Sequence, residues 1–219
     1  MITYKEIKND PTIRTYISAA NDSLAALGFT DHSVAHVAHV AEMAGDILEK
    51  LGFDERTVEL TKIAGFLHDI GNLVNRTDHS QSGALLAFRI LDNMGMPPAE
   101  IAAVTTAIGN HDEGTGDPVN AISAALILAD KSDVRRSRVR NQDPSTFDIH
   151  DRVNYSVTSS KLDINAPEKA ITLALVIDTE LSSVMNYFEI FLKRMIMCRK
   201  AAQRLGLQFR LTINDQQLM

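Results

Sequence analysis

The stretch DHSVAHVAHVAEMAGDILEKLG, residues 31–52, decides the fold class. Its apolar residues recur at three- and four-residue intervals, which is the spacing of one face of an α-helix, and Asp31 can cap the start. His32, His36 and His39 stand at positions i, i+4 and i+7, so they project from roughly one face of that helix. A histidine on an apolar face is more often a packed core residue than a ligand, so this spacing needs support from elsewhere in the chain.

The neighbouring sequence predicts further helices joined by short connections, which together favour a compact helical bundle. The segment 144–219 differs, because runs of β-branched residues there predict three strands, and an amphipathic helix is expected between the second and the third. We therefore expect a mainly α protein, with a helical domain over residues 1–143 and a small α+β appendage over 144–219. The expected helices span 11–27, 31–51, 54–71, 79–94, 98–110, 119–140 and 180–205, and the expected strands 154–160, 170–178 and 207–213.

Bulk properties exclude several classes of protein. A net charge of −6 argues against a general binder of nucleic-acid polymers, whose basic surface neutralises phosphates. The N-terminus lacks the apolar core of a signal peptide and the longest apolar run is far too short for a bilayer, so we expect a cytoplasmic protein with no membrane partner. Because Cys198 is the only cysteine, thiolate zinc and iron–sulfur sites are excluded within one chain. Any metal ion must then be held by nitrogen and oxygen.

Support for a histidine site comes from GFLHDIG, residues 65–71. Side chains adjacent in a helix diverge by about 100°, so His68 and Asp69 can address one site most easily where their helix ends, and Gly71 supplies that end. A further carboxylate, Asp130, closes an apolar helical run, with Asp133 as its rival.

In chain order, His36, His68-Asp69 and Asp130 resemble the H…HD…D signature of the HD superfamily of metal-dependent phosphohydrolases, over roughly residues 30–135. The resemblance implies an HD-type helical domain in which these four residues hold a metal ion.

His79 and His111 are similar to corresponding positions in the two-metal branches of that superfamily, including the HD-GYP group. The resemblance implies that Asp69 bridges to a second ion bound by these two histidines. Imidazole with carboxylate ligands suits iron or manganese, with nickel, cobalt and zinc as alternatives. A net positive centre with two divalent ions favours an anionic substrate.

Departures from the family pattern restrict the substrate. Asp112 stands where HD-GYP proteins have a second histidine, and residues 116–118 read GDP where those proteins have GYP, so hydrolysis of cyclic dinucleotides is not expected. Many relatives carry a lysine near substrate phosphate at the position of Asn72, and Arg76 could replace its charge. The basic run that follows Asp130 offers further candidates for substrate binding, Arg135 and Arg136.

The predicted function is metal-dependent hydrolysis of a small phosphate ester or anhydride, with nucleotides among the candidates, by a water molecule that two metal ions activate. The predicted catalytic residues are the bridging Asp69 and, beside His111, Asp112 or Glu113, which could orient the water or accept a proton. One alternative is a di-iron oxygenase of the same fold. Another is a non-enzymatic regulatory protein that binds metal and dimerises. The strand edges of 144–219 could pair with a second copy in a homodimer.

Overall fold

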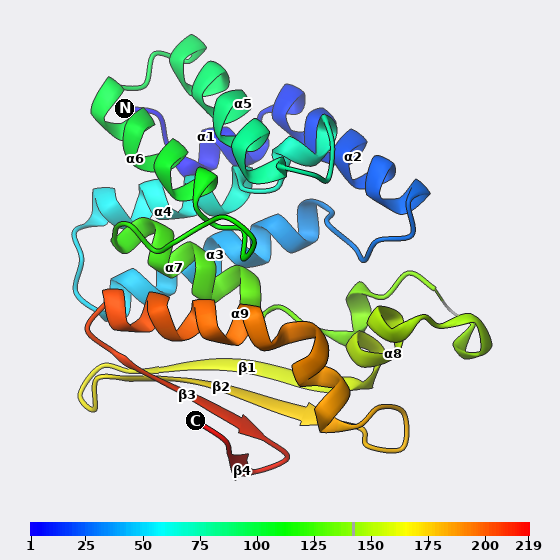
Figure 1. Ribbon diagram of the computed structural model, residues 1–219. Helices are drawn as coiled ribbons and strands as arrows, with labels where there is room; N and C mark the ends of the chain where they lie inside the picture. Colours follow the sequence, from blue (N-terminus) through cyan, green and yellow to red (C-terminus); the bar gives the residue numbers. More distant parts are fainter. Residues whose placement is uncertain (142) are drawn as a thin grey trace.

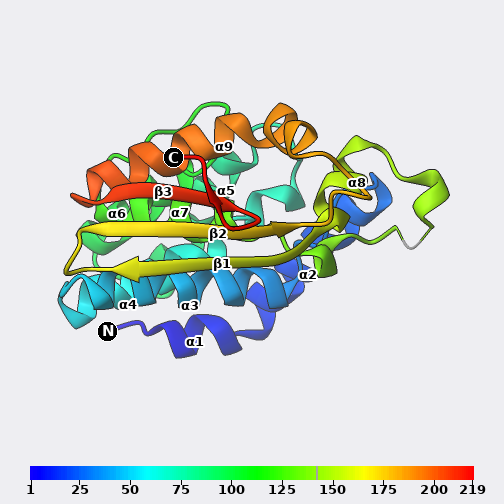
Figure 2. The same ribbon diagram turned by 90° about the horizontal axis from the view of Figure 1, so that it is seen from below.

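A computed structural model describes residues 1–141 and 143–219 (Figure 1). Helices α1 to α7 form a bundle, and a four-stranded sheet lies on one side of it, with α9 packed between the sheet and α7 (Figures 1 and 2). The helices of the bundle are α1 (Tyr4–Asn9), α2 (Pro11–Ala26), α3 (Val34–Lys50), α4 (Glu55–Leu67), α5 (His79–Asn93), α6 (Pro98–Gly109) and α7 (Ala121–Ser132).

Helix α3 lies at the centre of the bundle because its apolar face is buried against α4 and α7. Helices α3 and α4 cross at very close range, where a Cβ atom on Gly65 would stand only 2.6 Å from the Cα atom of Ala41. Only glycine fits at such a contact. The crossing lies three residues before His68 and five after His36, so it brings these two histidines together.

A second close contact fixes the chain that follows α4. The 3₁₀ helix η1 (Ile70–Leu73) runs beside the start of α5, and a Cβ on Gly71 would stand 1.9 Å from the carbonyl oxygen of His79. Gly71, which the sequence predicts to end α4, therefore also sets the position of His79 relative to Asp69.

The sheet has the order β1-β2-β3-β4, with β1 (Val157–Asn165) antiparallel to β2 (Ala170–Ile177) and β3 (Gln208–Ile213) parallel to β2. Helix α9 (Val184–Arg204) makes the crossover between the parallel strands. Strand β4 (Gln216–Gln217) pairs antiparallel with β3. Alternate residues of β2 and β3 are buried, so one face of the sheet packs on the helices.

The mainly α fold class with a small C-terminal sheet is confirmed, but several bounds differ from the predictions. Helix α7 ends at Ser132 instead of near residue 140, because Asp133 leaves helical geometry with ψ at 74°. The chain then forms the 3₁₀ helix η2 (Arg136–Arg138), where the carbonyl of Arg138 accepts a hydrogen bond from the backbone N–H of Asp31.

Near the sheet, residues 154–156 belong to helix α8 (Ile149–Ser156) rather than to a strand, because Asp148 caps the start of that helix. Strand β1 continues to Asn165, past the expected strand end at residue 160. The short elements α1, β4 and η3 (Pro144–Thr146) were not predicted from the sequence. One continuous set of buried apolar side chains extends from the bundle into the sheet. Within the described chain, no helix has both the length and the apolar character needed to cross a membrane.

Candidate metal centre

All six side chains predicted as ligands converge at one place between the helices. Each comes from an element end or a helix face whose position the bundle fixes: α3 carries His36, the end of α4 carries His68 and then Asp69, the first residue of α5 is His79, His111 follows α6, and α7 carries Asp130. Asp130 is nearly buried, with 11% of its side chain exposed, and the other five are buried.

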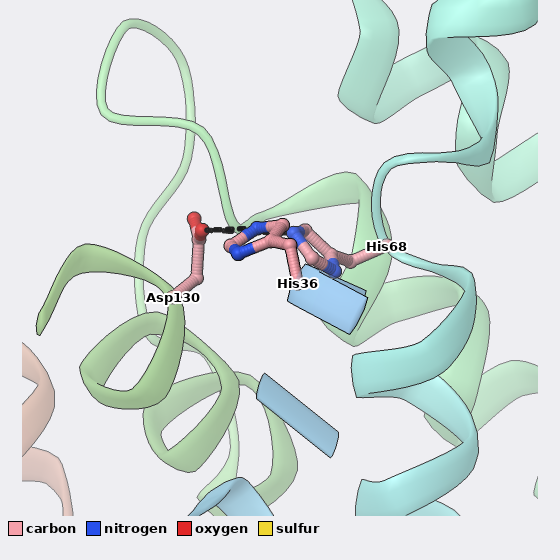
Figure 3. A group of neighbouring side chains, drawn as sticks. All are labelled: His36, His68 and Asp130. Atoms are coloured by element: carbon pink, nitrogen blue, oxygen red, sulfur yellow. Dashed lines mark ion pairs between the residues drawn. The ribbon is translucent and has the colours of Figure 1, made fainter. Parts of the chain in front are cut away.

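One group of candidate ligands consists of His36, His68 and Asp130, which point toward one another in Figure 3. The Nε2 atoms of both histidines lie 3.6 Å from Oδ1 of Asp130. These separations leave room for a cation among the three atoms, so this group is a candidate metal site.

Asp69 lies between that group and two further histidines. Its Oδ2 atom is 3.0 Å from Nε2 of His68 and 3.6 Å from Nε2 of His36. Its Oδ1 atom is 3.6 Å from Nε2 of His79, which is itself 3.1 Å from Nε2 of His111. Oδ2 of Asp69 therefore faces His36 and His68, and Oδ1 faces His79, whose ring lies beside that of His111. A second group of candidate ligands consists of His68, Asp69 and His111.

The other ring nitrogen of each histidine, Nδ1, is held by an oxygen acceptor. For His36 the acceptor is Oδ2 of Asp133, at 2.8 Å. For the other three it is a backbone carbonyl three residues earlier: Gly65 for His68 at 2.8 Å, Arg76 for His79 at 3.1 Å, and Ile108 for His111 at 2.6 Å. A proton held on Nδ1 leaves the lone pair of Nε2 available for a metal ion, and fixes the orientation of the ring.

Unpaired nitrogens and ionised carboxylates at the centre also fit a bound metal ion. The Nε2 atoms of His36 and His68 are buried and have no hydrogen-bond partner among the described residues. Leaving a buried polar atom unpaired costs about 1–3 kcal/mol, which a bound cation would offset. Burial alone would raise the pKa of both carboxyl groups. His68 and then His32 hold the pKa of Asp69 well below the usual range, and Lys131, followed by His36 and His68, does the same for Asp130. Both carboxylates are therefore ionised and attract positive charge.

Comparison with known proteins agrees with this geometry. Residues 34–145, more than half of the chain, match the family described as HD domain. This chain belongs to the HD domain family. The matched residues include all six candidate ligands and end before α8 begins.

Relatives of the HD domain chain include an uncharacterized protein, MJ1020, of Methanocaldococcus jannaschii, which is 26% identical over 201 residues, covering 81% of this chain and 76% of the relative. Ribonuclease Y of Enterococcus faecalis is 32% identical over 110 residues, covering 49% of this chain but only 19% of the ribonuclease. A crystal structure of a predicted HD superfamily hydrolase from an uncultured Thermotogales bacterium has 24% identity and a TM-score of 0.43, covering 62% of this chain and 75% of the other.

A cavity of about 360 Å³ opens onto the candidate metal centre of the HD domain. Its walls come from the bundle and also from the C-terminal segment, which we define as residues 144–219. Bundle residues in the walls include Phe29, His32, Asp69, Arg76, His79, His111, Asp130, Lys131 and Arg138, and the C-terminal segment adds Asp148, His150, Asp151, Asn154, Phe191 and Arg194.

Of the arginines predicted to bind substrate, Arg76 lines this cavity, and its Nη1 atom lies 3.9 Å from Oδ1 of Asp69. Arg135 and Arg136 are not among the residues of its walls. Arg135 donates to both carboxylate oxygens of Asp133, and Arg136 donates to the carbonyl of Tyr155 and lies over its ring. The prediction assumed helical spacing after Asp130, and the chain leaves the helix three residues later.

The loop carboxylates predicted to assist catalysis also lie outside the cavity walls. Asp112 is half-buried and accepts a hydrogen bond from the backbone N–H of Gly114. Glu113 lies 2.7 Å from Nζ of Lys131 and accepts a hydrogen bond of 2.8 Å from Nε of Arg194. Burial alone would raise the pKa of Glu113, but these two cations hold it far below the usual value, which makes Glu113 a weak base.

Sequence reasoning missed three residues around the centre. Asp133 was considered only as a rival to Asp130, although a carboxylate that accepts a hydrogen bond from the second ring nitrogen of a ligand histidine is a usual feature of metal sites. Arg138 is buried and donates to the carbonyl oxygens of Asp31 and Asp133. Arg194 stands in an amphipathic helix whose pattern indicates packing alone, so the sequence carries no signal for it.

Proposed function

We propose that this HD domain holds two divalent transition-metal ions and hydrolyses a small phosphate ester or anhydride. The observation that carries the proposal is the position of Asp69, whose Oδ2 faces His36 and His68 while Oδ1 faces His79, with His111 beside it. A carboxylate between two groups of nitrogen ligands is suited to bridge two ions.

The residues present fit this donor set. His36, His68 and Asp130 would hold one ion with Oδ2 of Asp69, and His79 and His111 would hold the other with Oδ1. Mixed imidazole and carboxylate ligands favour iron or manganese, with nickel, cobalt and zinc as alternatives. When bound, such ions lower the pKa of a coordinated water molecule toward neutrality and stabilise charge that develops on phosphoryl oxygens.

Four cationic side chains, those of Arg76, Lys131, Arg138 and Arg194, line the cavity beside the candidate centre, and four carboxylates line it too. Two divalent ions would therefore make the net charge of the cavity positive, and an anionic substrate would be drawn to its cationic side. The acceptors at Nδ1 keep each ring in one orientation. The name of the relative ribonuclease Y denotes cleavage of RNA, a phosphodiester, which supports phosphoryl chemistry for the shared region.

The test starts from metal-free protein, prepared with a chelator, that is reloaded with manganese or iron and incubated with a panel of phosphate esters and anhydrides, nucleotides included. We expect release of inorganic phosphate that depends on the metal and persists without oxygen. Asp69→Asn should abolish it. Product formation only in the presence of oxygen would instead favour an oxygenase. Stabilisation by metal without turnover on any substrate would favour a regulatory role.

A further inference from the structure

We propose that Arg194 binds the phosphate group of the substrate, and that the C-terminal segment forms the wall of the cavity that recognises the rest of the molecule. The inference rests on the proposed phosphohydrolase function and deepens it. Arg194 lies on α9, beyond the residues that match the HD domain family.

The guanidinium of Arg194 is held in one orientation, but some of its hydrogen-bond donors have no acceptor within the described residues. Its Nε atom donates to Oε1 of Glu113 at 2.8 Å, and its Cζ atom lies 4.6 Å from the centre of the Phe191 ring. Neither Nη atom donates to an acceptor within residues 1–141 and 143–219, and 26% of the side chain stays exposed where it lines the cavity. Two adjacent Nη donors held in one plane match the oxygens of a phosphate group.

Two other cations in the walls are more fully engaged. Nζ of Lys131 lies within 2.8 Å of carboxylate oxygens of both Asp130 and Glu113. Arg138 donates through two of its nitrogens to backbone carbonyls, and only 9% of its side chain is exposed. Arg76 makes one hydrogen bond of 3.3 Å, from Nη1 to the side chain of Asn72, and 27% of its side chain is exposed. Among the described residues, Arg76 and Arg194 are therefore the two wall cations with the most donors left for a ligand, and of the two it is Arg194 whose guanidinium is oriented by a hydrogen bond to a carboxylate.

A chain of ion pairs connects Arg194 to the candidate metal centre. It runs from Asp130 through Lys131 and Glu113 to Nε of Arg194, with separations of 2.8, 2.7 and 2.8 Å. These ion pairs fix the guanidinium relative to Asp130. A phosphate group bound by Arg194 must have such a fixed position to be aligned with the metal centre. The ion pairs also give Glu113 a role as a positioning residue in place of the catalytic one predicted from the sequence.

The rest of the C-terminal wall indicates the chemical class of the substrate. Helix α8 and its cap contribute Asp148, His150, Asp151 and Asn154 to the cavity. Carboxylates repel phosphate and accept hydrogen bonds from hydroxyl or amino groups. The phosphate should then lie toward Arg194, and a part with hydroxyl or amino groups toward α8. A cavity of about 360 Å³ fits a small phosphate monoester of this kind.

Isothermal titration calorimetry of the metal-loaded full chain with inorganic phosphate tests the role of Arg194. Loss of a charge-assisted hydrogen bond should weaken phosphate binding by about 10- to 100-fold in Arg194→Gln. Arg194→Lys keeps the charge beside Glu113 and should weaken binding less. Metal content should not change. The matched control is Arg199→Gln, an exposed arginine on the same helix, which should bind phosphate like the unmodified protein.

Thermal unfolding followed by circular dichroism identifies a variant that fails to fold. If Arg194→Gln fails to fold, the phosphate affinity of Arg194→Lys is the test. A folded Arg194→Lys that binds phosphate as tightly as the unmodified protein would overturn the proposal. Equal affinity in a folded Arg194→Gln would overturn it too, even if the unmodified protein hydrolyses phosphate esters. If metal-loaded unmodified protein neither binds phosphate nor hydrolyses any ester, the proposed function fails together with this inference.

The substrate class has its own test once turnover is found. Glycerol phosphate and n-propyl phosphate have the same number of carbon atoms, but only the first has free hydroxyl groups. We expect a lower KM for glycerol phosphate, because its hydroxyls can donate to the carboxylates of α8. Equal kcat/KM for the two esters would reject this class of substrate.

Discussion

The helical bundle and the C-terminal segment line the same cavity by different means. In the bundle, three of the four central histidines are fixed by hydrogen bonds to backbone carbonyls three residues earlier, so local backbone geometry places them. In the C-terminal segment, Arg194 is fixed by an ion pair to Glu113, which lies far away in the sequence. Local structure therefore positions the candidate ligands, and tertiary packing positions the residue proposed to bind phosphate.

The substitution with the largest expected effect removes the carboxylate shared by both halves of the centre. Asp69→Ala should lose both metal ions and all metal-dependent activity, because Oδ1 and Oδ2 face different histidines. Inductively coupled plasma mass spectrometry of the reloaded variant measures this. Asp46→Ala, at an exposed position of α3, is the control and should keep its metal. Full metal content in the Asp69 variant would refute the bridging role.

An intermediate effect is expected where a side chain, rather than the backbone, orients a histidine. Asp133→Ala removes the acceptor at Nδ1 of His36 and should lower metal affinity by about 10- to 100-fold. Asp133→Asn keeps an oxygen at this position and should lose less. Competition with a chelator measures the affinity, and thermal melts show whether Arg138, which contacts Asp133, still packs. Equal affinity in all three proteins would show that this contact does not orient the ligand.

The smallest effect is expected at Arg136, which the sequence placed near the substrate. Arg136→Ala should leave KM and kcat unchanged, because this side chain contacts Tyr155 outside the cavity walls. It should lower the free energy of unfolding by about 0.5–1 kcal/mol through loss of the cation–π contact. Urea unfolding and steady-state kinetics measure the two quantities. A raised KM would restore the original assignment of Arg136 to substrate binding.

These cases show why part of the site could be predicted from the sequence. His68, Asp69 and His111 stand where helices end. A histidine or aspartate at the point where a helical hydrophobic pattern stops can be recognised in the sequence as a candidate ligand. Asp130 likewise closes an apolar run. The mainly α fold followed from the same periodicity.

The rest could not be predicted because it depends on contacts between distant segments. Helix α7 stops at Ser132 although no glycine or proline follows directly, because Arg138 and its neighbours bond to the segment around Asp31. Arg194 has the sequence environment of any surface arginine on an amphipathic helix. Only the packing of α9 on α7 brings it to the cavity.

The most direct test of the account is the metal content of the unmodified protein and of His79→Ala, after both are reloaded and freed of excess metal. Because His79 faces Oδ1 of Asp69 and the other group lies at Oδ2, the account predicts two ions per chain in the unmodified protein and one in the variant. One ion per chain in both proteins would contradict it, and would reduce the centre to the single group of His36, His68, Asp69 and Asp130.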